Sequence, residues 1–169
     1  MRVLGIDCGS ENTGYGVVEL DDAGHLRCIV SGTVRASARL AMAVRLNKIF
    51  KGLQEVIEEY NPDKVALEDV FYAVNVKSAL KLGQVRGVAM LVASNAGLEV
   101  AEYAPLTIKS AVVGYGRAEK HQVQQMVTRL LRLEAPPESP DAADALAIAI
   151  CHLHTEATVG RQRASRGTR

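Results

Sequence analysis

Apolar residues near the start of the chain fall into short runs, each bounded by turn-forming residues. Runs rich in Val, Ile and Leu at residues 3–6, 15–20 and 26–34 predict three strands, because such residues favour extended backbone. Short segments rich in Gly, Asn and Asp separate them, which predicts an antiparallel meander.

After residue 37 the apolar positions adopt helical spacing and alternate with two further short runs. Ser37 is a suitable N-cap for a long amphipathic helix that ends at Asn61 and Pro62. Strands are predicted at Lys64–Glu68 and residues 98–103, and helices at Val76–Asn95, Pro105–Val113, residues 118–133 and from Ser139 onward. A helix that joins two strands of one sheet makes those strands parallel. We therefore expect an α/β fold with a five-stranded mixed sheet, an antiparallel meander of three strands plus two parallel strands, flanked by helices.

The length of 169 residues and the hydrophobic content of 48% suit one buried domain, which we place at residues 1–156. Residues 157–169 contain four arginines and no acid, and we expect them to form a disordered basic tail. Subtracting these four from the 20 basic residues leaves 16, against 19 acidic residues. A nucleic-acid partner would therefore have to be held by a local basic patch.

The same sequence excludes some classes of protein. No apolar run reaches the roughly 18 residues that span a bilayer, and the N-terminus lacks a signal-peptide pattern, so we expect a cytoplasmic protein without membrane contact. Cys8, Cys28 and Cys151 are odd in number and widely spaced, which fits reduced core thiols better than a disulfide framework or a zinc site.

Two carboxylates stand at the ends of predicted strands. Asp7 ends the first strand before a Gly-rich turn, and Glu68 ends the fourth. Because these strands are expected to be parallel, their carboxyl ends should meet at one edge of the sheet. Asp69 should point to the opposite face by strand alternation, so we leave it out of the site.

Two further acids lie at the start of the last helix. Ser139 is the expected N-cap and Pro140 the first helical residue, so Asp141 lies in the first turn and Asp144 one turn later on the same face. That face continues into apolar residues and must meet the body of the protein. An inward pair of acids is costly unless a cation or hydrogen bonds balance it.

The four acids together predict a metal site. Carboxylate oxygens without Cys or His partners suit Mg²⁺ or Mn²⁺. Two such ions about 3.5–4 Å apart can activate water and stabilise the leaving oxygen of a phosphodiester. Phosphodiester hydrolysis is the reaction that this set of residues favours.

Other features leave alternatives open. Gly83 and Gly87 lie on one face of a predicted helix and indicate close approach by another backbone, either within the domain or across a dimer. Phe71 and Tyr72 are core residues or stack on an unpaired base. Four residues close in sequence are either a local basic patch or part of an ordinary solvated surface: Lys109, Arg117, Lys120 and His121.

Four segments closely resemble the RuvC Holliday junction resolvases, and the resemblance covers about residues 1–155. The segments are GIDCG at 5–9, LEDVF at 67–71, SALKLGQVRG at 78–87 and DAADALAIA at 141–149. The resemblance implies a ribonuclease H-like fold. It also implies an endonuclease that resolves four-way (Holliday) DNA junctions in recombination and repair by paired symmetric nicks.

The resemblance also implies roles for particular residues. A catalytic tetrad that binds two Mg²⁺ ions, with Mn²⁺ as a substitute, would consist of Asp7, Glu68, Asp141 and Asp144. Lys120 would be catalytic by offsetting charge in the transition state. The resemblance places Phe71 beside the junction, and Lys109 and Lys120 near the scissile phosphate. Our full expected DNA-binding set adds the basic residues Lys77, Lys81, Arg86 and Arg117. The family further implies a homodimer that works with the RuvA–RuvB branch-migration complex.

Three alternatives compete with this interpretation. A related ribonuclease H-like nuclease that processes ribosomal RNA precursors shares the early Asp and Gly-rich turn, but the helix with Gly83 and Gly87 favours the junction enzyme. Actin-like and sugar-kinase ATPases need two lobes, and this chain has length for one. A junction-binding module without activity would have no reason to keep four repelling acids.

Overall fold

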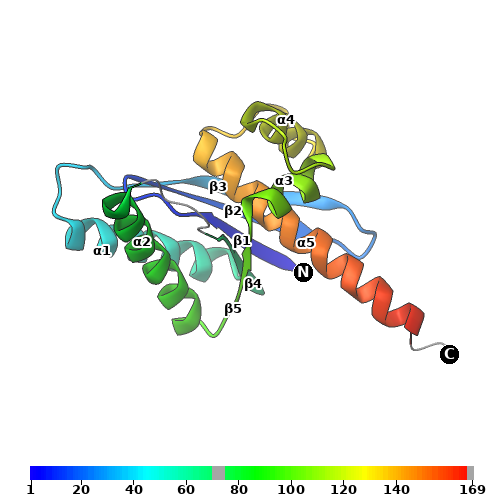
Figure 1. The fold of residues 1–169 in the computed structure, drawn as a ribbon. Coiled ribbons are helices and arrows are strands. Elements are labelled where there is room, and N and C mark those ends of the chain that lie inside the picture. The colour runs from blue at the N-terminus through cyan, green and yellow to red at the C-terminus, as the bar shows by residue number, and fades with distance from the viewer. Residues whose placement is uncertain (70–74, 167–169) are drawn as a thin grey trace.

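The computed structural model describes residues 1–69 and 75–166, with side chains described as far as residue 159. One sheet with strand order β3-β2-β1-β4-β5 forms the middle layer (Figure 1). Its strands are β1 (Arg2–Asp7), β2 (Asn12–Leu20), β3 (Leu26–Arg35), β4 (Lys64–Glu68) and β5 (Glu99–Tyr103). The first three are antiparallel, while β4 runs parallel to β1 and β5 parallel to β4. The predicted five-stranded mixed sheet is confirmed.

Helices cover both faces of the sheet. The chain forms α1 (Met42–Tyr60), α2 (Val76–Asn95), α3 (Pro105–Val113), α4 (Lys120–Leu130) and α5 (Pro140–Arg166). Figure 1 shows α1 and α2 on one side, and α5 crossing the other side with α3 and α4 beyond it. Of the helices in residues 1–69 and 75–166, none combines the length and apolarity needed to cross a membrane.

Strand alternation divides the core into two layers. On β1, Leu4 and Ile6 pack with α1 and α2, while Val3 packs with α5. On β4, Leu67 belongs to the α1 and α2 layer and Ala66 to the α5 layer. Because side chains alternate between faces, the last residues of both strands, Asp7 and Glu68, lie on the α5 side.

Glycines let α5 pack directly on the strands. A Cβ at Gly5 would lie 2.0 Å from the carbonyl oxygen of Ala145, and one at Gly14 would lie 2.0 Å from that of Asp141. Both distances are far below van der Waals contact, so only glycine fits at these two positions. The contact at Gly14 holds the first turn of α5 against the strand that pairs with Asp7.

Local chemistry explains where two helices begin. The helix expected after Ser37 starts at Met42 instead, because the Ser37 hydroxyl accepts the Arg39 N–H and closes a separate turn. The expected cap at Ser139 is confirmed, since its hydroxyl accepts the Ala142 N–H at 3.1 Å.

Two helix boundaries differ from the sequence pattern. α4 is shorter than the expected 118–133, because Glu119 and Gln122 form a capping box at its start and Arg132 has a left-handed φ of 52° beyond its end. α5 continues to Arg166, so most of the expected tail 157–169 is helical. Ala, Gln and Arg in this stretch favour helix, which explains the extension.

Packing at Gly5 can be tested by adding one methyl group. Gly5→Ala should lower the free energy of unfolding by about 2 kcal/mol or more, because α5 must move away from β1. Asn47→Ala is the matched control, since Asn47 is exposed on α1, and it should raise stability by about 0.5 kcal/mol because Ala favours helix. Urea unfolding of both variants measures the difference. Equal stability of the two variants would contradict the packing described here.

Candidate active site

Two strand ends bring Asp7 and Glu68 to the same edge of the sheet. β1 and β4 are parallel neighbours in which Ile6 pairs with Leu67, so the next residues along each strand are Asp7 and Glu68. Asp69 points to the other face, where its carboxylate lies 3.8 Å from the guanidinium of Arg86. The structure therefore separates Asp69 from the other two acids, as strand alternation predicts.

The start of α5 adds two more acids to this edge. Its N-cap Ser139 also shares a hydrogen bond of 2.7 Å with the hydroxyl of Thr33 on β3, which fixes the helix start over the sheet. Asp141 and Asp144 follow in the first two turns, and Asp141 lies against β2 at Gly14. The four acids that the sequence singles out are thus neighbours in space.

The electrostatics of Asp7 show how close these acids are. Burial, followed by the charges of Asp144, Glu68 and Asp141, raises the pKa of Asp7 to about 7. Burial and the charge of Asp144 also raise the pKa of Glu68. The acids therefore repel one another, and at neutral pH Asp7 is only partly ionised.

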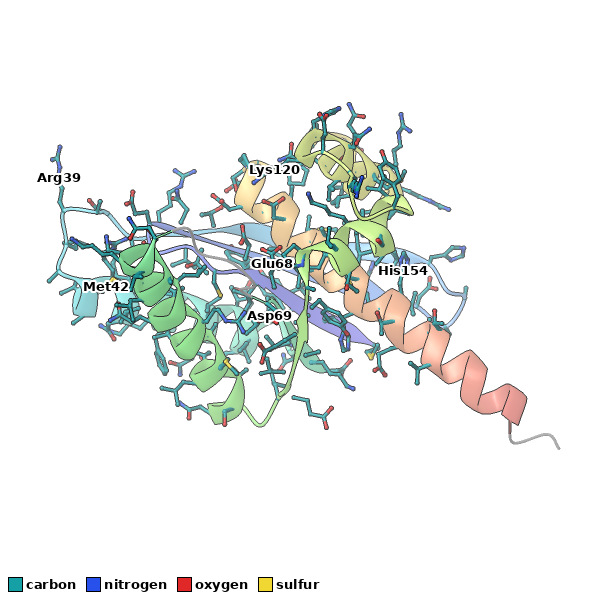
Figure 2. The ribbon with its side chains drawn as sticks, in the orientation of Figure 1. Arg39, Met42, Glu68, Asp69, Lys120 and His154 are labelled. Carbon is teal, nitrogen blue, oxygen red and sulfur yellow. The ribbon has the colours of Figure 1, made fainter. Side chains whose placement is uncertain are left out.

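Lys120 supplies a positive charge to the same cluster. It is the first residue of α4, and its Nζ lies 2.5 Å from Oδ2 of Asp144. Burial lowers the pKa of Lys120, but the hydrogen bond and charge of Asp144 outweigh it, so the pKa is raised and the side chain stays protonated. Figure 2 shows Lys120 near the start of α5 and Glu68 beside the same helix.

A cavity of about 170 Å³ opens between these charged groups. Glu68 and Asp144 line it together with Lys109 and Lys120, and apolar side chains of α3, α4 and α5 complete the wall. Two carboxylates facing two ammonium groups can hold cations beside an anionic phosphate.

The donor set fits hard divalent cations. The residues that could hold them are Asp7, Glu68, Asp141 and Asp144, all of which offer only carboxylate oxygens. In residues 1–69 and 75–166, no three Asp, Glu, His or Cys side chains are gathered tightly enough to hold a metal ion as they stand. The mutual effects on the pKa of Asp7 nevertheless place all four within electrostatic reach of one another.

The expected DNA-binding residues have different surroundings. Lys109 lines the cavity with Lys120, which supports their expected place beside a phosphate. Lys77, Lys81 and Arg117 are exposed. Phe71 and Tyr72 lie outside the described residues. In the expected basic patch, Nδ1 of His121 lies 3.2 Å from Oε2 of Glu119, so an acid adjoins this part of the patch.

Arg86, which belongs to the expected DNA-binding set, has partners within the protein. Its side chain is only 12% exposed, and its guanidinium donates to the backbone carbonyl of Glu68 and to the carboxylate of Glu102. It lies on the face of the sheet opposite the acid cluster. Its guanidinium is thus engaged by protein acceptors.

Sequence reasoning also missed Arg45, which is 5% exposed on α1. Its Nε donates to the carbonyl oxygen of Ser10 at 2.9 Å, within the turn that follows Asp7. A single arginine in an amphipathic helix is normally expected to be exposed to solvent. The hydrophobic pattern therefore gave no reason to predict that Arg45 contacts the turn after Asp7.

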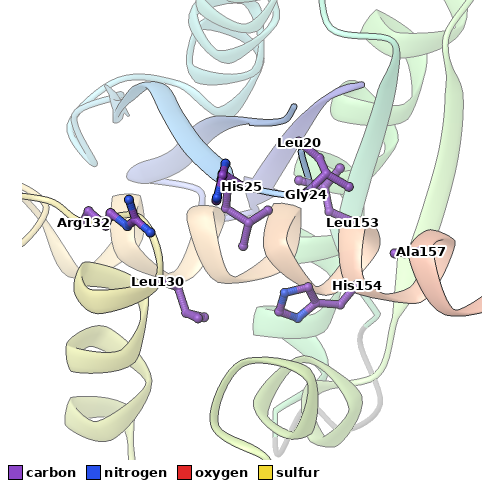
Figure 3. Close-up of a pocket in the computed structure, with 9 residues that line it drawn as sticks. Leu20, Gly24, His25, Leu130, Arg132, Leu153, His154 and Ala157 are labelled. Atoms are coloured by element: carbon purple, nitrogen blue, oxygen red, sulfur yellow. The ribbon is translucent and has the colours of Figure 1, made fainter. Parts of the chain in front are cut away.

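A larger cavity, of about 550 Å³, lies away from the acids (Figure 3). It has an apolar lining that includes Leu20, Leu130 and Leu153, with His25 and Arg132 also lining it. None of the predicted site residues lines it. Cavity size alone therefore does not mark the acidic site.

Comparison with known proteins shows what this chain is similar to. Residues 3–152 match the family described as "Crossover junction endodeoxyribonuclease RuvC". The protein of that name from Koribacter versatilis is 65% identical over 164 residues, which cover 97% of this chain and 99% of that protein. The one from Acidobacterium capsulatum is 56% identical over 169 residues, covering 96% and 99%.

A solved structure agrees with these relatives. The structure "T. thermophilus RuvC in complex with Holliday junction substrate" has a TM-score of 0.87 and 34% sequence identity, and the match covers 92% of this chain and 94% of that chain. This likeness confirms the predicted ribonuclease H-like fold.

Repulsion among the acids predicts how stability depends on pH. Charging Asp7 costs stability in the folded protein, since its pKa rises from 3.8 to about 7. This cost is absent at pH values below 3.8, where Asp7 is protonated in both states, and fully present above about pH 7, where it is charged in both. Without divalent cations, Asp7→Asn should therefore stabilise the protein at pH 8 by about 2 kcal/mol, allowing for partial exposure of the carboxylate.

The advantage of Asp7→Asn should shrink as the pH falls towards about 4.5. Urea unfolding in EDTA at both pH values measures it. Asp22→Asn, a change in an exposed turn, is the matched control. An equal gain from Asp7→Asn at both pH values would show that the charge of Asp7 is not the cause.

Proposed function

Because this chain belongs to the RuvC family of crossover junction endodeoxyribonucleases, we infer that it is an endonuclease that resolves four-way DNA junctions in recombination and repair. It would place one nick in each of two opposing strands. The observation that carries this proposal is the group of acids beside Lys120, within a match that spans residues 3–152. The same match supports this function over ribosomal RNA processing.

RuvC enzymes are metal-dependent nucleases, and we propose Mg²⁺ as the metal here, with two ions per site and Mn²⁺ as a substitute. They would be held by Asp7, Glu68, Asp141 and Asp144. Bound ions of this kind activate water and stabilise the leaving oxygen of the phosphodiester. The raised pKa of Asp7 means that its proton has to leave before the carboxylate can hold a cation, so loading should improve as the pH rises through about 7.

The lysines of the cavity contribute positive charge of their own. Lys120 stays protonated beside Asp144, where its ammonium can offset negative charge that builds up on the phosphate in the transition state. Lys109 lines the same cavity and can position the phosphate before cleavage. Phosphate contacts of this kind fix the register of DNA on the enzyme.

Local charge would also hold the DNA on the rest of the surface. Lys77 and Lys81 are exposed on α2, and Arg117 is exposed in the loop before α4. We propose these three as backbone contacts. Stacking by Phe71 remains a proposal from the family resemblance. A DNA substrate also supports the expected cytoplasmic location.

The exposed face of α2 supports a homodimer. Val76, Leu80 and Leu91 are 78%, 65% and 53% exposed, which is unusual for apolar side chains. Within the part of the chain that the structure describes, nothing lies within 4 Å of a Cβ added at Gly83 or Gly87. The described residues therefore do not make the close approach expected at these glycines, which supports a second copy as its source. Cooperation with RuvA–RuvB remains a proposal from the family.

Substrate preference tests the proposed function directly. With Mg²⁺ or Mn²⁺, the protein should nick a synthetic four-way junction in preference to a linear duplex or an RNA–DNA hybrid. Asp7→Asn should slow junction nicking by at least about 1,000-fold, because it removes a charged ligand, while junction affinity stays within about twofold. Cleavage is followed on gels, and affinity by mobility shift in Ca²⁺.

Two outcomes would contradict the proposal. Preference for either linear substrate would favour a different nuclease of the same fold. Full cleavage by Asp7→Asn in Mg²⁺ would exclude Asp7 as a required ligand.

The dimer can be tested through the apolar face of α2. Leu80→Glu should shift the protein from dimer to monomer in sedimentation at micromolar concentration, because burying a carboxylate in an apolar interface is costly. Leu106→Glu is the matched control, since Leu106 is 63% exposed but lies on α3, and it should leave the dimer intact. A wild-type monomer at this concentration, or a dimer unaffected by Leu80→Glu, would exclude this interface.

A further inference from the structure

Arg86 connects α2 to the ends of two strands. Its guanidinium donates to the carbonyl oxygen of Glu68 at the end of β4 and to the carboxylate of Glu102 on β5. The carboxylate of Asp69 lies 3.8 Å away. One planar group thus contacts the last residue of β4, the residue after it, and the neighbouring strand.

These contacts lie on the face of the sheet opposite the acid cluster. Glu102 alternates with Tyr103, which packs in the α5 layer, so Glu102 points towards α2. Asp69 alternates with Glu68 in the same way. Arg86 therefore contacts the backbone of Glu68 from the α2 side of the sheet. The carboxylate of Glu68 stays free to face Asp7 and Asp144 on the α5 side.

The end of β4 is held by more than one backbone contact. The N–H of Asp69 donates to the carbonyl oxygen of Tyr103 at 2.8 Å, which continues the pairing with β5. The contact from Arg86 to the Glu68 carbonyl secures the peptide group between Glu68 and Asp69 from the other side. With its backbone fixed at both groups, Glu68 can vary its carboxylate position only through its own side-chain torsions.

The other strand end has a similar support. Arg45 on α1 is buried and donates to the carbonyl oxygen of Ser10, three residues after Asp7. Arginines from the same helical layer thus secure the backbone beside both strand-end acids. This recurrence indicates a support for the site rather than an isolated surface ion pair.

We propose that Arg86 is a positioning residue that holds the backbone of Glu68 so that its carboxylate stands ready to bind a divalent cation. The proposal rests on the proposed function in that Glu68 is taken as a metal ligand. The planar guanidinium is needed because it donates to the carbonyl and to Glu102 at once, which a lysine ammonium does without fixed geometry. Supports of this kind typically change metal affinity by about 10–100-fold when removed.

The test compares Mn²⁺ binding by full-length variants without DNA, measured by calorimetry. Arg86→Gln should weaken Mn²⁺ binding by about 10-fold or more. Arg86→Lys should recover only part of this loss, because lysine restores the positive charge but not the planar pair of N–H donors. Junction affinity in Ca²⁺ should stay within about twofold in both variants, since the proposal has Arg86 hold protein acceptors and not phosphate.

Lys81→Gln is the matched control from the same helix. It should weaken junction binding and lower the salt dependence by about one counterion, while Mn²⁺ affinity stays unchanged. If Arg86→Gln behaves like Lys81→Gln, Arg86 is a phosphate contact and the proposal is overturned.

Further outcomes separate this proposal from its premises. Unchanged Mn²⁺ affinity in Arg86→Gln, or complete recovery in Arg86→Lys, would overturn the positioning role. If Arg86→Gln does not fold, Arg86→Lys alone decides, because it retains the charge and should still lose at least about threefold in Mn²⁺ affinity. Failure of the wild-type protein to bind Mn²⁺ or to cut junctions would instead reject the proposed function.

Discussion

Repulsion among carboxylates at one edge of the sheet is the constraint that the rest of the structure has to satisfy. Burial and three neighbouring acids raise the pKa of Asp7 to about 7, so the folded chain holds these groups together against their charges. The apolar face of α5, with Leu146, Ile150 and Leu153 fully buried, provides the packing that opposes this repulsion. Lys120 offsets part of the charge through Asp144. The site thus depends on the docking of one helix.

The two faces of the sheet carry different kinds of residues. The α5 face carries the acids and the lysines, which would meet metal and DNA. The opposite face carries Arg86 and Arg45, which donate to backbone carbonyls and to acids beside the site. Strand alternation makes this division possible, because consecutive residues such as Glu68 and Asp69 point to opposite faces. A proposed metal ligand and a residue that contacts the supporting arginine can therefore be adjacent in the sequence.

Much of this arrangement could be predicted from the sequence, because it rests on periodicity. The strand ends at Asp7 and Glu68, and the helix cap at Ser139, follow from local patterns that the structure bears out. Contacts between distant segments could not be predicted in this way. Arg86 was expected on DNA because its charge is visible in the sequence, whereas its acceptor Glu102 lies on another strand. The helix start at Met42 was missed because Ser37 closes a turn of its own.

The glycine contacts beneath α5 set the tolerance of the site. At Gly5 and Gly14 the helix rests on strand backbone, with no side chain between them. Backbone atoms in contact are nearly incompressible and have no rotamers to exchange. The distance between the strand-end acids and those of α5 is therefore set by backbone contact and not by side-chain packing. Substitutions that repack the core elsewhere should leave this spacing nearly unchanged.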